Sequence, residues 1–232
     1  MRYIYSAIAT FLFLNSYSQN FSFPEIKDNA SNIVDFIPAN WIILDSATGD
    51  LNRDGFVDVA LILLHKDSVS LKNNNNDTVI TQPRMLLILF KHSQDNSYLL
   101  IERSNSFILT HDNPFMDDPY KEISIERNIL KLSFHLFYNS GSWYSTSSIY
   151  KFRFDNKSFV LIGADISTIH RATLDFEDYS YNFLTTKRIY TKGNEQKNTR
   201  KTSVKNIDIT HPMTFRTFPK PYTWEIEKDV VL

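Results

Sequence analysis

The sequence predicts an all-β protein made of antiparallel hairpins or a meander, sandwich-like or propeller-like, with one short N-terminal helix at most. Runs rich in β-branched and aromatic residues recur along the 232-residue chain, and short polar segments separate them. Apolar residues at helical spacing are nearly missing. With 42% hydrophobic and 22% charged residues, the composition excludes a disordered chain.

The first 18 residues predict a secretory signal peptide. Arg2 gives a positive start, residues 4–14 form an uncharged and mostly apolar run, and small residues precede a cleavage site after Ser18. The run is shorter than the roughly 20 residues that cross a bilayer, and no other segment reaches that length. We therefore expect an exported protein, periplasmic or extracellular, without a membrane span. A buried N-terminal strand or helix is the alternative.

We expect residues 19–232 to form a single all-β domain, because no clear linker divides them. A short helix is expected at 27–36, and Pro38 ends it. Strands are then expected at 41–47, 57–65, 84–92, 98–103, 122–127, 129–138, 142–154, 159–166, 172–176, 180–192 and 201–207.

The predicted strands differ in burial and in their connections. Continuous apolar runs at 59–64 and 85–90 predict central strands covered on both faces. The polar insertion between them, 66–82, is expected to form a flexible loop. A weak repeat at 89–101 and 152–162 places an Asp-Asn turn between two strands. It favours repeated hairpins as in a propeller, although any two hairpins resemble each other.

Charge and residue counts exclude several kinds of site. The net charge of −1 gives no global field toward nucleic acid or an anionic membrane. The chain has no cysteine, which excludes disulfides, thiolate nucleophiles and zinc–thiolate sites. Only five glycines are present, and none forms a nucleotide-type Gly-rich loop.

One loop, residues 50–58, has polar residues at the spacing of a metal-binding loop. Side-chain oxygens stand at its first, third, fifth and ninth positions, and glycine stands sixth, where the chain must bend sharply. The expected ligands are Asp50, Asn52, Asp54, Asp58 and the carbonyl oxygen of Phe56. Close carboxylates repel one another unless a cation lies between them, and hard oxygens without imidazole or thiolate select calcium. We expect a structural Ca²⁺ that crosslinks two strands; a metal-free acidic turn is the alternative.

The flanks of this loop point to a family. The twelfth position is Leu61 rather than glutamate, and both flanks are predicted strands, unlike the helix–loop–helix calcium sites. The segment 41–64 resembles the calcium loop of integrin-type β-propellers, in the FG-GAP/VCBS repeat family. The resemblance implies Ca²⁺ ligation by Asp50, Asn52, Asp54, Asp58 and the Phe56 carbonyl. The chain as a whole looks similar to exported bacterial proteins that carry a single such loop.

A second group of titratable residues lies in a proline-containing segment. Its members are His111, Asp112, Asp117 and Asp118. They suggest a second metal site or an acid/base pair, but a turn stiffened by proline explains them more simply.

Two surface features near the C-terminal half allow two interpretations. Lysine or arginine stands at seven positions between 187 and 205. This stretch predicts a solvated edge hairpin that turns near Gly193 and Asn194, with a polyanion or glycan surface as the alternative. The adjacent aromatic residues Trp143 and Tyr144, beside a predicted turn, either pack the end of a sheet or stack on sugar.

No catalytic residues are assigned. Ser140-Gly141-Ser142 lacks the sequence context of an activated nucleophile, and the six histidines are scattered. We therefore expect a non-catalytic, calcium-binding interaction protein of the bacterial cell envelope, whose partner is another protein or an envelope glycan. An inhibitor or immunity-type protein that neutralises a toxin or hydrolase is one alternative, and a glycan-acting enzyme is another.

Overall fold

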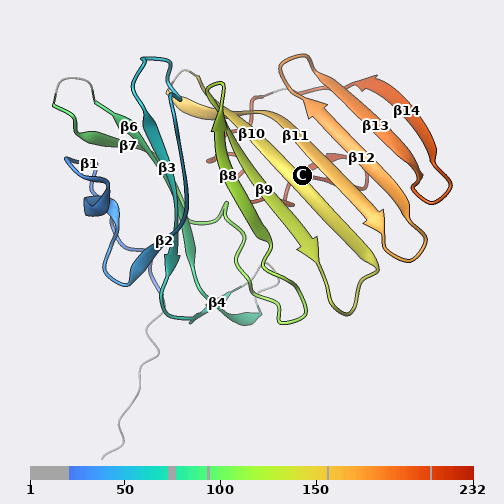
Figure 1. The fold of residues 1–232 in the computed structure, drawn as a ribbon, viewed down its shortest axis with the longest axis horizontal. Helices are drawn as coiled ribbons and strands as arrows, with labels where there is room; N and C mark the ends of the chain where they lie inside the picture. Colours follow the sequence, from blue (N-terminus) through green and yellow to red (C-terminus); the bar gives the residue numbers. More distant parts are fainter. Residues whose placement is uncertain (1–20, 73–76, 93–94, 156, 210) are drawn as a thin grey trace, which may run out of the picture.

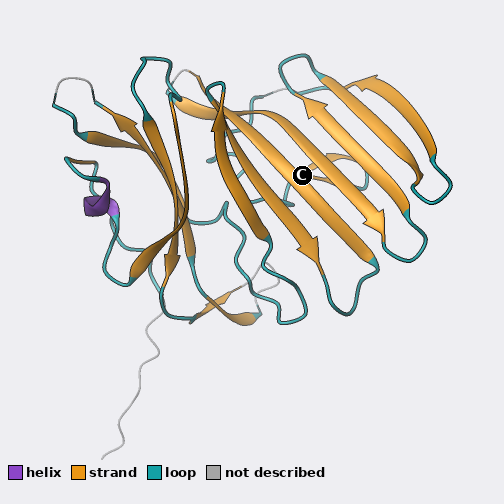
Figure 2. Cartoon of the chain, in the orientation of Figure 1, coloured by secondary structure: helices purple, strands orange, loops and turns teal. Residues whose placement is uncertain are grey.

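The fold is described from a computed structural model, which places residues 21–72, 77–92, 95–155, 157–209 and 211–232. These residues form antiparallel sheets, so the all-β class predicted from the sequence is confirmed (Figure 1 and Figure 2). The sole helix among them is a short 3-10 segment, η1 (Ile33–Phe36), inside the predicted helix. The predicted signal peptide lies outside the described residues.

Two large sheets contain most of the strands. The five-stranded sheet has the order β1 (Asn29–Ala30), β7 (Tyr98–Ser104), β6 (Arg84–Lys91), β3 (Asp58–His65), β2 (Trp41–Gly49). The seven-stranded sheet is a meander of β8 (Tyr120–Glu126), β9 (Ile129–Phe137), β10 (Tyr144–Asp155), β11 (Ser158–His170), β12 (Asp175–Asn182), β13 (Lys187–Asn194) and β14 (Thr199–Asn206). Separate hairpins are formed by β4 (Val69–Lys72) with β5 (Thr78–Thr81), and by β15 (Glu225–Glu227) with β16 (Val230–Val231).

Strands β3 and β6 are covered on both faces, as their continuous apolar runs predict. Alternate residues such as Ile62 and Ile88 belong to the core shared with the seven-stranded sheet. The intervening residues, such as Leu61 and Leu87, pack with Phe36 and the N-terminal segment in a second cluster. Because both faces are buried, these two strands lack the alternation of apolar and polar residues found in half-exposed strands.

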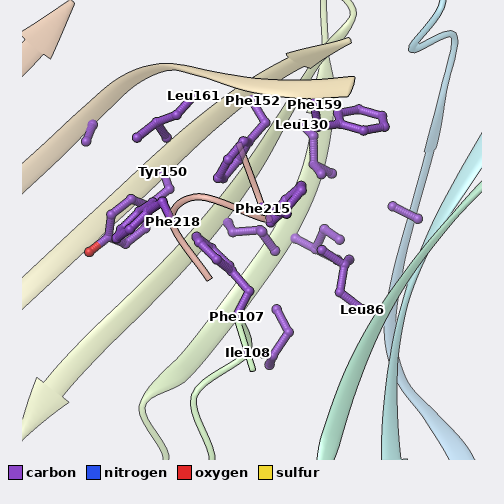
Figure 3. Packing of buried hydrophobic residues seen from close by; sticks show 14 of the residues in the cluster. Leu86, Phe107, Ile108, Leu130, Tyr150, Phe152, Phe159, Leu161, Phe215 and Phe218 are labelled. Carbon is purple, nitrogen blue, oxygen red and sulfur yellow. The ribbon is translucent and has the colours of Figure 1, made fainter. Parts of the chain in front are cut away.

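The core between the two sheets is rich in aromatic rings. Phe107, from the loop after β7, lies with its ring centroid 5.2 Å from Phe152 of β10. Phe215 follows the last strand of the meander; its ring stacks on Phe152 at 4.1 Å and lies 5.0 Å from Phe107. Figure 3 shows Phe107, Phe215 and Phe218 gathered against the seven-stranded sheet. One core therefore joins both sheets and the chain after β14. Of the two architectures that the sequence leaves open, this arrangement is the sandwich-like one.

The predicted division of residues 172–192 into two strands is wrong in its boundaries. The structure has β12 and β13 there, joined by a turn at 183–186. The Asn182 side chain makes this turn, because its Oδ1 accepts the N–H groups of Leu184 and Thr185, each at 3.1 Å. Neither glycine nor proline stands at this turn, so the aromatic and β-branched residues on both sides of it were predicted to form one continuous strand.

The turn predicted near Gly193 and Asn194 is present, whereas the segment predicted as a loop at 66–82 contains two strands. The turn between β13 and β14 follows Asn194, and every residue of the edge strand β14 is exposed. The insertion 66–82 contains the β4–β5 hairpin, while its Asn73–Asn76 tract lies outside the described residues. Among the described residues, no helix is long and apolar enough to cross a membrane.

Candidate metal centre

The loop between β2 and β3 is shaped by its own side chains. Asp50 Oδ1 accepts the N–H of Arg53 at 2.6 Å, and its Oδ2 accepts the N–H of Gly55 at 3.0 Å. Arg53 and Gly55 both have positive φ, 67° and 87°, so the chain reverses within a few residues. Glycine adopts this backbone at little steric cost, which explains the requirement for Gly55 at the sixth position.

Asn52 and Asp54 complete the same turn. Asn52 Nδ2 donates to Asp54 Oδ2 at 2.8 Å, and Asp54 Oδ1 accepts the N–H of Phe56 at 2.8 Å. Asn52 Oδ1 in turn accepts the N–H of Asp54 at 3.0 Å. The predicted ligands Asp50, Asn52 and Asp54 are therefore brought together in one exposed loop.

Asp58 occupies a different environment, at the base of the loop. Its side chain is fully buried, with Oδ2 accepting the N–H of Leu51 at 2.8 Å and Oδ1 accepting the N–H of Lys91 at 3.0 Å. Burial raises the pKa of Asp58, and the two backbone donors oppose this rise. Asp58 thus ties the loop to the end of β6, a role that the spacing did not predict.

Two contacts from the seven-stranded sheet hold the loop from outside. Asn128, in the turn between β8 and β9, donates a side-chain hydrogen bond to the carbonyl oxygen of Asp50. A Cβ on Gly49 would lie 2.5 Å from Cγ2 of Ile125, so the backbone of β2 packs directly on β8. The loop therefore sits at the junction of the two sheets. The positive φ of Asn128 is typical of a turn residue, but its partner 78 residues away was not predictable from local pattern.

The donor types fit a hard cation. The loop presents carboxylate and amide oxygens, and a carboxylate oxygen that accepts one N–H retains a lone pair for a metal. Among the described residues, no group of three or more His, Cys, Asp or Glu side chains is placed to hold a metal ion. The present arrangement is the acidic turn held by side-chain-to-backbone bonds, in which Asp50, Asn52 and Asp54 cluster and Asp58 faces the backbone.

The second predicted cluster does not form a metal site among the described residues, although His111, Asp112 and Asp118 line one surface pocket. Asp118 pairs with the buried Arg84, whose Nη1 and Nη2 lie 2.8 and 2.5 Å from its two oxygens. His111 Nε2 lies 2.6 Å from the carbonyl oxygen of Met116, and Asp117 accepts from Asn139 at 3.2 Å. Since these side chains have separate partners, they stabilise the proline-containing turn.

Comparison with known proteins adds no family assignment: no protein-family model matches the chain, and no curated protein or solved structure gives a significant match.

Proposed function

We propose that the chain is an exported, non-catalytic binding protein of the bacterial cell envelope that carries one structural calcium ion. The observation that carries this proposal is the loop 50–58, where oxygen side chains cluster at the junction of the two sheets. Extracellular calcium is abundant enough for weak sites of about 10⁻⁴ to 10⁻³ M to be occupied. An ion in this loop would therefore act in the compartment that the predicted signal peptide indicates.

The ligands in this proposal are Asp50, Asn52, Asp54, the Phe56 carbonyl and Asp58. The bound ion would offset the repulsion among the carboxylates. The chain's own residues supply the remaining connections, because Asn128 holds the loop to the seven-stranded sheet and Asp58 holds it to β6. Calcium would then stiffen a point where both sheets meet, in a chain that has no disulfides.

Calorimetric titration of the purified protein with calcium tests this proposal. We expect about one site in the range of 10⁻⁴ to 10⁻³ M and weaker binding of magnesium, which demands stricter octahedral geometry. The double variant Asp50→Asn with Asp54→Asn should lose the binding, because it removes two anionic ligands with little change in shape. The matched control is Asp35→Asn, at an exposed carboxylate in η1. Absence of binding at millimolar calcium, or equal binding by the double variant, would contradict the site.

A further inference from the structure

An open groove of about 850 Å³ lies on the seven-stranded sheet, at the end that carries the β11–β12 and β13–β14 turns (lower right in Figure 1). Strand register builds its floor. Thr168, Glu177, Lys192 and Lys201 are successive cross-strand partners in one row. The next row on the same face contains Asp175, Asn194 and Thr199, because residues two apart on a strand point to the same side.

Two exposed aromatic side chains, Tyr144 and Trp143, lie at the β10 side of this groove. Tyr144 lines the groove, is 55% exposed, and meets the His170 ring edge-to-face at 5.0 Å. Trp143 is 65% exposed and stacks on the same His170 ring at 6.3 Å. The turn beneath them is held, since the N–H of Arg171 donates to the carbonyl oxygen of Trp143 at 2.8 Å. The Tyr144 ring is thus held at the groove with Trp143 beside it, and both rings keep exposed apolar surface that is available to a ligand.

The opposite side of the groove supplies cations. Lys192, Lys197 and Lys201 line it, and none of them forms an ion pair with a described residue. Arg200 differs, because it pairs with Glu195 at 3.0 Å and lies over the Phe176 ring. The charge of Lys197 acts on Asp175 within the groove without forming a salt bridge, so all three ammonium groups can still pair with an anionic partner.

The two carboxylates in the groove already have donors. Asp175 accepts from Asn194 Nδ2 and from Thr173 Oγ1, each at 2.7 Å, and Glu177 accepts from the Tyr190 hydroxyl at 2.9 Å. They are therefore held in fixed positions beside the lysines, and each retains lone pairs that can accept from a ligand hydroxyl.

We propose that this groove binds an anionic oligosaccharide, with a sugar ring against Tyr144 and its acidic substituents at Lys192, Lys197 and Lys201. The structure unites two features that are separate in the sequence, the exposed aromatic pair and the basic stretch. The inference deepens the proposed binding function and rests on it in treating the chain as a binding protein. It does not depend on the calcium loop, which lies on other elements.

The mixture of groups favours a glycan over a nucleic acid. Sugar hydroxyls donate as well as accept, so Asp175, Glu177 and Asn194 suit them, whereas the phosphate groups of a nucleic acid backbone offer these carboxylates no hydrogen-bond donor. Hydrogen bonds from Asn194 and Thr173 hold the pKa of Asp175 below its usual range, so this carboxylate stays ionised and can accept from a ligand hydroxyl.

Binding of four probes to the purified protein tests the proposal: hyaluronan hexasaccharide, heparin hexasaccharide, maltohexaose and the oligonucleotide dodecathymidylate. We expect at least one anionic hexasaccharide to bind, with affinity that falls as salt rises. Maltohexaose should bind at least tenfold more weakly, since it lacks the charges. Chromatography of the sugar after incubation should recover it uncleaved.

Variants locate the site. The pair Lys192→Ala with Lys201→Ala should weaken binding at least tenfold, and Tyr144→Ala should weaken it severalfold. The matched control removes the same charge elsewhere, through Lys121→Ala with Lys187→Ala, because both residues are exposed and outside the groove. Thermal unfolding checks that each variant remains folded.

Several results would overturn the inference: no binding of either anionic hexasaccharide, equal loss in the control pair, tighter binding of the oligonucleotide, or cleavage of the sugar. Its failure is distinguishable from failure of the calcium proposal. A protein that takes up calcium but neither anionic sugar contradicts the groove alone. A protein that binds the sugar but not calcium contradicts the calcium site alone.

Discussion

At the scale of single residues, Asp58 shows how a predicted ligand can have a structural task. The spacing places it ninth in a calcium loop, but the fold buries it completely and directs both oxygens to backbone N–H groups. The clustering of Asp50, Asn52 and Asp54 was predictable because their contacts are local. The contacts of Asp58 with Lys91 and of Asp50 with Asn128 were not predictable, since sequence pattern does not reveal which distant residues lie against the loop.

Replacing Asp58 by asparagine should therefore destabilise the protein even without metal. One of its two backbone N–H partners would face an amide NH₂ instead of an oxygen, which costs about 1–3 kcal/mol of unfolding free energy. Urea unfolding in the presence of a chelator measures the change. The exposed control Asp35→Asn should stay within about 0.5 kcal/mol of the wild type. Equal stability of Asp58→Asn and wild type would contradict the anchoring role.

The ion pair between Arg84 and Asp118 makes stability depend on pH. Burial raises the pKa of Asp118, but hydrogen bonds and charge from Arg84 outweigh it and hold this pKa below its usual range. Because the folded value is below the unfolded value of about 3.9, the pair stabilises the fold above that pH. The contribution is lost as pH falls through the lowered folded pKa.

We expect Asp118→Asn to lower the thermal unfolding temperature at pH 7, and the gap from the wild type to close as the pH falls through the lowered folded pKa of Asp118. Melting curves recorded from pH 7 downward measure the gap between the two proteins. Asp208→Asn, at an exposed carboxylate, serves as the control and should follow the wild type throughout. A gap that persists unchanged at low pH would show that the ion pair is not its cause.

At the scale of elements, the sequence predicted strands well where burial dominates and poorly where one side chain makes a turn. The runs at 59–64 and 85–90 are apolar throughout because β3 and β6 are covered on both faces. The turn at 183–186 was missed because Asn182 forms it without a glycine or proline. The burial of Phe107 inside the core was also not predictable, since it belongs to a loop between two strands, where no alternation of apolar and polar residues marks a buried position.

Phe107 is the element-scale test of the shared core. Its ring contacts Phe152 of the meander and Phe215 of the C-terminal segment, so truncation would leave a cavity between three parts of the chain. We expect Phe107→Ala to cost about 3–5 kcal/mol of unfolding free energy, measured by urea denaturation. Phe115→Ala, at a ring that is 59% exposed, is the control and should cost far less. Similar losses in both variants would contradict the packing.

At the scale of the whole molecule, two sheets and a C-terminal segment share one core, and the candidate metal loop lies where the sheets meet. The all-β class was predictable because strand pattern depends on local composition. The partition into a five-stranded and a seven-stranded sheet was not, since it depends on pairings between distant strands. The groove at one end of the meander was not predictable for the same reason, since its lining residues come from β10 to β14.

The most direct test of the central claim is equilibrium unfolding of the purified protein with chelator and with calcium. A single site filled at a hundredfold excess over its Kd should raise the unfolding free energy by about 2.7 kcal/mol. Magnesium should raise it less, and Asp50→Asn with Asp54→Asn should remove the calcium effect. A calcium-independent stability of the wild-type protein, or an equal gain in that double variant, would contradict the account.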